Sequence, residues 1–258
     1  GMKCWLDGAF QQMVANRSDM YSFNSRVKRV ENLLRKLDEK IDSNMLTDDL
    51  DWTEVDNYDD LKLNIDDIVG GRLITFFVKD IPDLMIYLTG FKHFCVREIT
   101  IHDMLNKPVL YQDTIKKLNI TNEVCSNILT SFPEKQRIQF DVNIKEFHPG
   151  CIVEQIPYEI RLNTNGYVGA HLIIQPLPDD DYWNNEPGLH DKFELQIRSL
   201  IHEAWSEIQH KVIYKGERMP EDVKLARASQ FTTLSSILSS CEDGLYDAAY
   251  PISDSDET

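Results

Sequence analysis

The segment FELQIRS, residues 193–199, alternates apolar and polar side chains with a period of two. In a β-strand this alternation places the apolar side chains on one face and Glu194, Gln196 and Arg198 on the other. A carboxylate, an amide and a guanidinium on one face can bind a metal ion and a phosphate group. An ordinary half-buried strand with one solvated face shows the same alternation. The segment therefore needs support from residues elsewhere in the chain.

A second carboxylate, Asp67, lies in the loop before the strand-like run RLITFFV, residues 72–78. Adjacent strands could bring Asp67 and Glu194 into one coordination sphere, and their hard oxygen ligands would select Mg²⁺ rather than zinc. Phosphoryl or pyrophosphoryl transfer requires such carboxylates, cations for the phosphates, and a means of positioning the attacking hydroxyl. Asp67 and Glu194 are therefore candidate Mg²⁺ ligands.

Candidate cations occur in RVKRVENLLRKLDEKI, residues 26–41. Its apolar residues recur at spacings of three and four, which predicts an amphipathic helix. The face opposite the apolar stripe carries Lys28, Asn32 and Arg35, flanked by Arg29 and Lys36. A solvated surface helix has such a face too. In a chain with a net charge of -16, however, so many cations on one face weaken that interpretation, and a local anion-binding site is the alternative.

Further strands are predicted from short apolar runs rich in β-branched and aromatic residues. They lie at residues 72–78, 95–101, 138–147, 152–162 and 170–177. The last two runs flank NTNGY, whose Asn-Gly pair is a turn signal. We therefore predict a hairpin with Tyr167 near its bend.

Helices are predicted after Asp80, which would cap the first of them, and at residues 113–132, 200–214 and 221–241. In the helix at 200–214 the expected buried stripe consists of Ile201, Trp205, Ile208 and Val212. The neighbouring polar face consists of Glu203, Glu207, His210 and Tyr214. The final helix would pack or pair through its apolar side.

The irregular alternation of strands and helices predicts an α+β fold, with a mixed β-sheet flanked by helices. We expect a single domain at residues 1–245, followed by an acidic, disordered tail at residues 246–258. A hydrophobic content of 42% is enough to build a buried core.

Composition excludes several classes of protein. Five cysteines without a CxxC pair suggest neither a disulfide framework nor a zinc cluster, and they favour a reducing, cytoplasmic setting. No window approaches the roughly 18 apolar residues of a membrane span. The negative net charge argues against a protein that wraps long nucleic acid, because phosphate neutralisation dominates that affinity.

Several enzyme classes fail on spacing. The segment HEAWS would need a histidine at position 206 to be a zinc-protease helix, and it has Ser206. Walker A, GxGxxG and GxSxG motifs do not occur in the sequence. His-Asp dipeptides at 102–103 and 190–191 are isolated and lie in loop-like surroundings. We interpret them as chance rather than as the ligands of a metal-dependent phosphohydrolase.

Four segments resemble the synthetase domain of the RelA/SpoT family, the GTP pyrophosphokinases that make the alarmones ppGpp and pppGpp, and occur in the family's order. RVKRVENLLRK resembles its basic ATP-side motif, and DIVGGRLITFFVKDI resembles the segment with its metal-binding Asp and a following Arg. NGYVGAH resembles the motif NGYxSxH. FELQIRSLIHEAWSEIQHKVIYK resembles the strand and helix with the catalytic Glu. The resemblance covers residues 26–240 and implies a nucleotidyltransferase-like fold.

The resemblance implies that the β,γ-pyrophosphate of ATP is transferred to the 3′-hydroxyl of GDP or GTP, with release of AMP. Asp67 and Glu194 would hold Mg²⁺, and Glu194 would also assist deprotonation of the hydroxyl. ATP would be bound by Arg26, Lys28, Arg35, Lys36 and Arg72. The acceptor would be bound by Tyr167, stacked on guanine, and by His171, Gln196, Arg198, His210 and Lys215. For His210 an ion pair with Glu203 or Glu207 on the helix surface is an equal alternative.

Four positions depart from the family motifs. Arg29 and Asn32 replace serines of the first motif, Asn163 replaces a Lys before NGY, and Gly169 replaces the motif Ser. Loss of that Lys removes a phosphate contact, so another purine nucleotide or a tRNA 3′ end is an alternative acceptor. A nucleotide-binding module without turnover is a second alternative. By resemblance to short members, we expect a synthetase-only protein that forms a homo-oligomer through its last helices.

Overall fold

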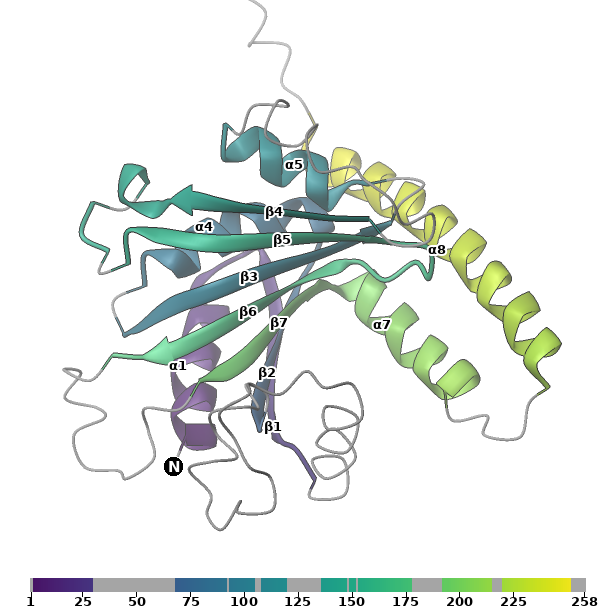
Figure 1. The fold of residues 1–258 in the computed structure, drawn as a ribbon, viewed down its shortest axis with the longest axis horizontal. Helices are drawn as coiled ribbons and strands as arrows, with labels where there is room; N and C mark the ends of the chain where they lie inside the picture. The colour runs from purple at the N-terminus through teal and green to yellow at the C-terminus, as the bar shows by residue number, and fades with distance from the viewer. Residues whose placement is uncertain are drawn as a thin grey trace, which may run out of the picture.

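The computed structural model describes residues 2–29, 68–91, 93–104, 108–119, 136–147, 149–151, 153–177, 192–214 and 220–251. The strands of these residues form one seven-stranded sheet in the order β1-β2-β7-β6-β3-β5-β4 (Figure 1). Their bounds are β1 Met20–Val27, β2 Val69–Thr75, β3 Phe94–Met104, β4 Gln136–Asn143, β5 Gln155–Asn163, β6 Gly169–Pro176 and β7 Phe193–Ser199.

The sheet mixes parallel and antiparallel pairs. β2 runs parallel to β7 and β3 runs parallel to β5, whereas the other neighbours pair antiparallel. The prediction of an α+β fold with a mixed sheet and flanking helices is therefore confirmed. The strands predicted at residues 95–101 and 193–199 are found as β3 and β7.

The longer helices are α1 Met2–Asn16, α4 Ile81–Thr89, α5 Leu110–Lys117, α7 Leu200–Gln209 and α8 Glu221–Ala249. In Figure 1 α1 and α4 lie behind the sheet, and α7 and α8 lie together beyond the end of β7. Short helical segments are η2 Val78–Asp80, η3 Ile144–Glu146 and the π-helix η4 His210–Tyr214. None of the described helices is long and apolar enough to cross a membrane.

The hydrophobic core lies against the face of the sheet that α1 and α4 cover. Phe193, Leu195 and Ile197 of β7 are fully buried in it, as their alternation predicts. Phe10 of α1 stacks on Phe23 of β1 with ring centroids 4.7 Å apart. Because this face is filled by the core, the polar residues of β7 point to the opposite face.

The helix predicted at residues 26–41 is wrong at its start. Arg26 and Val27 belong to β1 and pair with β2. Val27 is 55% exposed, so it does not belong to a buried apolar stripe. Pairing with a neighbouring strand decides the local structure here, and a helical spacing of apolar residues cannot reveal that partner. Residues 30–41 lie outside the described residues.

β5 and β6 do not form the predicted hairpin. β3 lies between them, parallel to β5 and antiparallel to β6. The connection at residues 164–168 therefore passes the end of β3. A turn signal predicts that the chain reverses its direction, but it does not predict which strand lies between the two arms.

Two helices differ from their predictions. α5 begins at Leu110 rather than at residue 113, and residues 120–132 lie outside the described part of the chain. In α7 the buried side chains are His202, Trp205 and Gln209, whereas Ile208 is 56% exposed. α7 therefore does not bury its most apolar face. It can bury polar side chains instead, because these have hydrogen-bond partners in the turn before β6 and in α8.

The two predicted boundaries near Asp80 and residue 246 also change. The carboxylate of Asp80 accepts the backbone N–H of Phe77 at 3.1 Å, so it caps η2 rather than α4. α8 continues to Ala249, and Tyr246 packs edge-on against Phe77 with ring centroids 5.3 Å apart. The start of the expected disordered tail is therefore an ordered helix end, while residues 252–258 lie outside the described residues.

Candidate functional site

A cavity of about 230 Å³ opens on the polar face of the sheet over β1, β2 and β7, with α7 as its wall. The parallel register of β2 and β7 places Gly70 beside Glu194 and Arg72 beside Gln196. β1 adds Asn24 beside Arg72. The charged residues of the lining are Arg26, Arg72, Glu194, Glu203 and Glu207. The cavity therefore combines cations with carboxylates.

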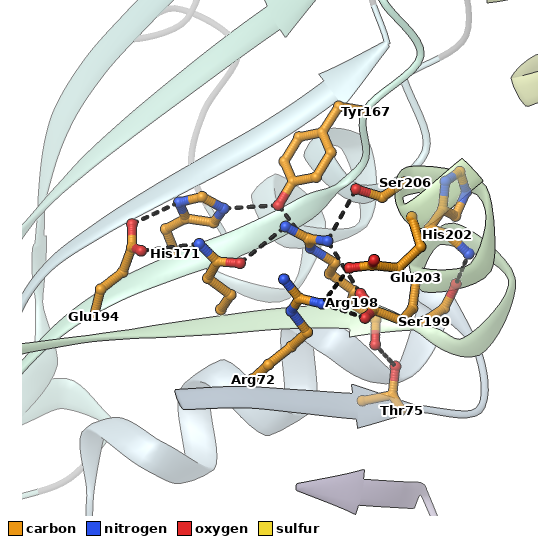
Figure 2. Close-up of polar contacts among 12 residues, drawn as sticks. Arg72, Thr75, Tyr167, His171, Glu194, Arg198, Ser199, His202, Glu203 and Ser206 are labelled. Atoms are coloured by element: carbon orange, nitrogen blue, oxygen red, sulfur yellow. Dashed lines mark hydrogen bonds and ion pairs between the residues drawn. The ribbon is translucent and has the colours of Figure 1, made fainter. Parts of the chain in front are cut away.

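Glu194 ends a chain of hydrogen bonds that Figure 2 shows. Its Oε1 lies 3.0 Å from Nδ1 of His171, whose Nε2 lies 2.7 Å from the Tyr167 hydroxyl. Nε of Arg198 donates to that hydroxyl at 2.9 Å. The hydroxyl is then free to donate to Nε2, so a neutral His171 carries its proton on Nδ1 and donates it to Glu194. Every donor in the chain thus points toward the carboxylate.

Gln196, which lies two residues after Glu194 on the same face of β7, joins the same network. Its Nε2 donates to Oε2 of Glu194 at 2.9 Å, and its Oε1 accepts from Nη2 of Arg198 at 2.8 Å. The three polar residues predicted on one face of the strand therefore lie in mutual contact. The Glu194 side chain keeps 21% of its surface exposed, so its carboxylate remains accessible from the cavity.

Two arginines share the acidic residues of α7. Nη1 of Arg198 donates to Oε2 of Glu203 and to Oγ of Ser206, both at 3.0 Å. Nη1 of Arg72 donates to the other oxygen of Glu203, and to Oε1 of Glu207 at 2.8 Å. Burial alone would lower the pKa of Arg72, but the bonds and charges of Glu207 and Glu203 raise it overall. Arg72 is therefore a charged side chain held at the cavity wall.

Glu203 and Glu207 are site residues that sequence reasoning missed. The helical period correctly predicts that they share a polar face. Their place opposite Arg72 depends on the parallel pairing of β2 with β7, which joins segments more than a hundred positions apart in the sequence. No local pattern carries that information.

Tyr167 directs its hydroxyl into the network. The guanidinium of Arg198 lies over its ring, 4.8 Å from the centroid. The rings of His102 and His171 lie roughly perpendicular to it, with centroid distances of 5.2 Å and 5.8 Å. Burial raises the pKa of Tyr167, against the opposing effect of Arg198, so the hydroxyl stays protonated at neutral pH. Its stacking on a guanine base stays a prediction.

The turn before Tyr167 is organised by Asn163 and Gly166. Nδ2 of Asn163 donates to the Tyr167 carbonyl at 3.1 Å, and its Oδ1 accepts from the backbone N–H of Asn165 at 3.2 Å. Gly166 has φ of 78°, a left-handed conformation that glycine adopts without a steric penalty. Asn163, which replaces the Lys of the family motif, thus has a structural task in the turn.

Gly169 is explained by close packing. A Cβ at this position would lie 2.8 Å from the carbonyl oxygen of Ile197 and 3.2 Å from Cγ of Arg198. The Ser of the family motif would collide with the backbone of β7 here. The absence of a side chain lets β6 and Arg198 approach each other closely.

His102 also belongs to this region, although its His-Asp dipeptide was interpreted as chance. Its ring centroid lies 4.6 Å from that of His171, and burial lowers the pKa of His102 to about 3, so it is neutral. Asp103 points to the other face of β3 and is fully buried, where it accepts the backbone N–H of Tyr111 at 2.6 Å. The two residues therefore do not act as a pair.

The remaining predicted residues are only partly described. Arg26 is exposed and lines the cavity. The backbone N–H of Lys28 donates to the Ile68 carbonyl at 2.8 Å, just beyond the end of β1. His210 is exposed in η4 and does not line the described cavity. The predicted site residues outside the described part of the chain are Asp67, Arg35, Lys36 and Lys215.

Comparison with known proteins relates this geometry to a family. The family model described as "Region found in RelA / SpoT proteins" matches residues 25–219. No curated protein sequence matches the chain.

Three solved structures from Bacillus subtilis share the fold. Small alarmone synthetase 1 has a TM-score of 0.51 and 19% identity, covering 96% of this chain and 89% of that chain. The same enzyme bound to its product pppGpp has a TM-score of 0.50 and 19% identity, covering 96% and 90%. Small alarmone synthetase 2 has a TM-score of 0.52 and 17% identity, covering 95% and 92%. Because the family model spans well over half of the 258 residues, the chain belongs to the RelA/SpoT family.

Proposed function

We propose that the protein transfers the β,γ-pyrophosphate of ATP to the 3′-hydroxyl of GDP or GTP. The acceptor oxygen attacks the β-phosphorus, the bond from that phosphorus to the oxygen bridging to the α-phosphate breaks, and AMP leaves. The observation that carries this proposal is the position of Glu194. Its carboxylate opens to a cavity that also contains two arginines, and its other contacts lead to Tyr167 through His171.

Glu194 is suited to take the proton of the attacking hydroxyl. A general base must be accessible and held in one orientation. Gln196 donates to one carboxylate oxygen and His171 lies in hydrogen-bond distance of the other. These donors stabilise the ionised form of the carboxylate, which is the form that accepts a proton. Tyr167, His171, Gln196 and Arg198 would form the acceptor side, with His210 and Lys215 as further candidates.

The cations of the cavity would bind the phosphates of ATP. Arg72 and Arg26 line it directly, and Lys28, Arg35 and Lys36 follow Arg26 in the sequence. Arg72 is bonded to Glu203 and Glu207. A polyphosphate would compete with Glu207 for this guanidinium, because phosphate oxygens accept its donors in the same geometry.

The donor chemistry of the site fits Mg²⁺. Among the described residues no three His, Cys, Asp or Glu side chains form a metal-binding group. Glu194 supplies one hard oxygen ligand, and its partner in the register of β2 and β7 is Gly70. Asp67 lies three positions before Gly70 in the sequence. Three residues of chain span at most about 10 Å, so a second carboxylate can reach the same ion. The ion would neutralise charge on the transferred phosphates.

Product analysis tests this proposal. The protein with ATP and Mg²⁺ is expected to form AMP and a 3′-pyrophosphorylated nucleotide when GDP or GTP is added. Glu194→Gln should lower kcat by about 10²–10⁴-fold, because it removes the base and a metal ligand. Glu154→Gln, which alters an exposed carboxylate paired with Lys145, is the matched control and should not change kcat. Full activity of Glu194→Gln would contradict the proposal.

Two alternatives follow from Asn163. Its side chain is engaged in the turn, so the phosphate contact expected from a Lys at this position is missing. A panel of purine nucleotides and tRNA tests whether another acceptor is preferred. Nucleotide binding without formation of AMP with any acceptor would instead favour a binding module without turnover.

We also propose a homo-oligomer that forms through α8. Its side chains Leu234, Ile237 and Leu245 are each more than half exposed, whereas its buried side chains are polar. Apolar surface of this kind is typical of subunit contacts. A monomeric mass in solution by light scattering would contradict this proposal.

A further inference from the structure

The turn that leads into Tyr167 is held by side chains from two distant helices. Oγ1 of Thr232 in α8 donates to the carbonyl of Thr164. Nε2 of Gln209 in α7 donates to the carbonyl of Asn165 at 3.0 Å. A third donor, Oγ of Ser235 in α8, binds the next carbonyl, that of Gly166, at 2.6 Å. Three consecutive carbonyls of the turn thus each accept one side-chain hydrogen bond.

The contact between α8 and the turn is close and is buried at Ser235, whereas the hydrogen bond of Thr232 lies at the surface. Ser235 is fully buried, and Gln209 is 6% exposed. A Cβ on Gly166 would lie 2.5 Å from Cβ of Ser235 and 3.1 Å from the Trp205 ring. The helix therefore packs directly on the backbone of the turn. Because Ser235 and its hydrogen bond to Gly166 are buried, loss of this donor would leave a buried carbonyl without a partner.

α8 is itself anchored beyond this contact, to Phe77 and Val78 in the segment that follows β2. Oε1 of the buried Glu242 accepts the backbone N–H of Val78 at 2.8 Å. Tyr246 packs edge-on against Phe77 in the same region. Thr232 and Ser235 are three residues apart and so lie on one face of the helix. The anchored helix consequently presents both hydroxyls to the turn from a fixed position.

The turn at residues 164–166 sets the position of Tyr167. Tyr167 directly follows Gly166, and its hydroxyl must meet both Arg198 and His171. A shift of the turn by a fraction of a hydrogen-bond length would break this double contact. The path from α8 to Glu194 is therefore continuous: helix hydroxyl, turn carbonyl, Tyr167, His171, carboxylate.

We propose that Ser235 and Thr232 are positioning residues of the acceptor site, which makes α8 a part of that site. Their hydroxyls fix the turn at 164–166 and thereby the ring and hydroxyl of Tyr167. This inference rests on the proposed role of Tyr167 in binding the acceptor. It extends the site to a helix whose described residues are not among those that line the cavity.

The test compares adjacent residues of one helix. Ser235→Ala and Thr232→Ala remove the donors to the turn. The matched controls are Ser236→Ala and Thr233→Ala, whose hydroxyls donate only to carbonyls of their own helix, those of Thr232 and Ser229. We expect Ser235→Ala to weaken equilibrium binding of GDP at least about fivefold, with binding of a non-hydrolysable ATP analogue changed less than about twofold. The controls should leave both affinities unchanged.

A double-mutant cycle separates positioning from general destabilisation. In the background of Tyr167→Ala, Ser235→Ala should no longer change GDP affinity, because the residue through which it acts is gone. Equal loss of GDP and ATP-analogue binding, an unchanged GDP affinity, or additive effects in the cycle would each overturn the inference. The binding assays do not require turnover. Coupled GDP binding in a protein that forms no AMP would refute the proposed function and leave this inference intact.

Discussion

At the scale of single residues, the site consists of side chains that orient one another. Glu194 is in contact with His171 and Gln196, and each of these is bonded to a further member of the network. Substitutions here will therefore act through neighbours, and their effects will not be additive. The direction of the hydrogen bonds is the informative property, because the bonds that lead from Arg198 through Tyr167 and His171, or through Gln196, all run toward the Glu194 carboxylate.

The Tyr167 hydroxyl gives a residue-level prediction. Tyr167→Phe keeps an aromatic ring for stacking but removes the group that accepts from Arg198 and donates to His171. His171 then loses its orientation toward Glu194, so kcat should fall roughly 10- to 100-fold while the KM for GDP changes little. Steady-state kinetics measures both constants. A raised KM with an unchanged kcat would show that the hydroxyl binds the acceptor instead of orienting the network.

Glu207 gives a second residue-level prediction. It is largely exposed, and its bond to Arg72 lowers its own pKa. In the proposed function it would compete with the phosphates of ATP for Arg72. Glu207→Gln should therefore lower the KM for ATP about twofold to fivefold, which is the range for one exposed ion pair. The KM for GDP should stay constant. A higher KM for ATP would mean that Glu207 holds Arg72 in its binding position and does not compete with substrate.

Part of this network was predictable from the sequence. A period of two is enough to place Glu194, Gln196 and Arg198 on one face. The contacts of Arg72 with Glu203 and of His171 with His102 were not predictable, because they depend on which strands are neighbours. A list of polar residues on each element does not contain the order of the elements.

At the scale of elements, strands were predicted better than their arrangement. Alternating and apolar runs predicted β3, β6 and β7, since each strand needs one buried face. The supposed hairpin failed because β3 separates β5 from β6. α7 differed in another way: it buries His202 and Gln209, and the polar partners that make this possible come from elements elsewhere in the chain.

The anchor of α8 gives an element-level prediction about pH. Burial raises the pKa of Glu242 to about 7, and the nearby Asp243 and Asp80 add to this effect. Burial also lowers the pKa of His202 to about 4, so the imidazole 3.6 Å from Glu242 is neutral at neutral pH and gives no ion pair. The folded protein therefore carries a penalty for ionising Glu242. The penalty is absent below pH 4.5, grows between pH 4.5 and 7, and is complete above pH 7.

Glu242→Gln removes this penalty while keeping an oxygen acceptor for the Val78 N–H. The variant should be more stable than the parent at pH 8, by on the order of 2 kcal/mol more than at pH 5. Chemical denaturation at both pH values measures the difference. Titration of His202 affects parent and variant alike and cancels in this comparison. An equal effect at pH 5 and pH 8 would contradict the assigned ionisation of Glu242.

At the scale of the whole molecule, a net charge of -16 coexists with a local group of arginines on one face of the sheet. The cations that matter are local: Arg72 and Arg198 lie on adjacent strands, and Arg26 joins them from β1. Net charge describes the molecule as a whole and therefore does not predict this local group of cations. These cations are far apart in the sequence, and the pairing of the strands brings them together on one face of the sheet.

The motif order in the sequence and the family match agree at this scale. Three of the motifs meet because β2 and β7 are parallel neighbours and β6 lies beside β7, and β1 brings the start of the first motif beside β2. Sequence motifs predicted the fold class through family resemblance, whereas composition and periodicity alone reached only a mixed sheet with helices. The β4-β5 pair beyond β3 was not identified from the motifs, since it lies in the interval between two of them.

The central claim is pyrophosphate transfer at the Glu194 cavity, and the fate of the ATP phosphates tests it most directly. ATP labelled at both the β- and γ-phosphorus is incubated with GDP, Mg²⁺ and the protein, and the products are identified by mass and by nuclear magnetic resonance. We predict that AMP and a guanosine nucleotide with both labelled phosphates on its 3′-oxygen appear in equal amounts, and that Glu194→Gln lowers the rate of formation of both by about 10²–10⁴-fold. Formation of ADP or free pyrophosphate in place of AMP, or equal product from Glu194→Gln, would contradict the account.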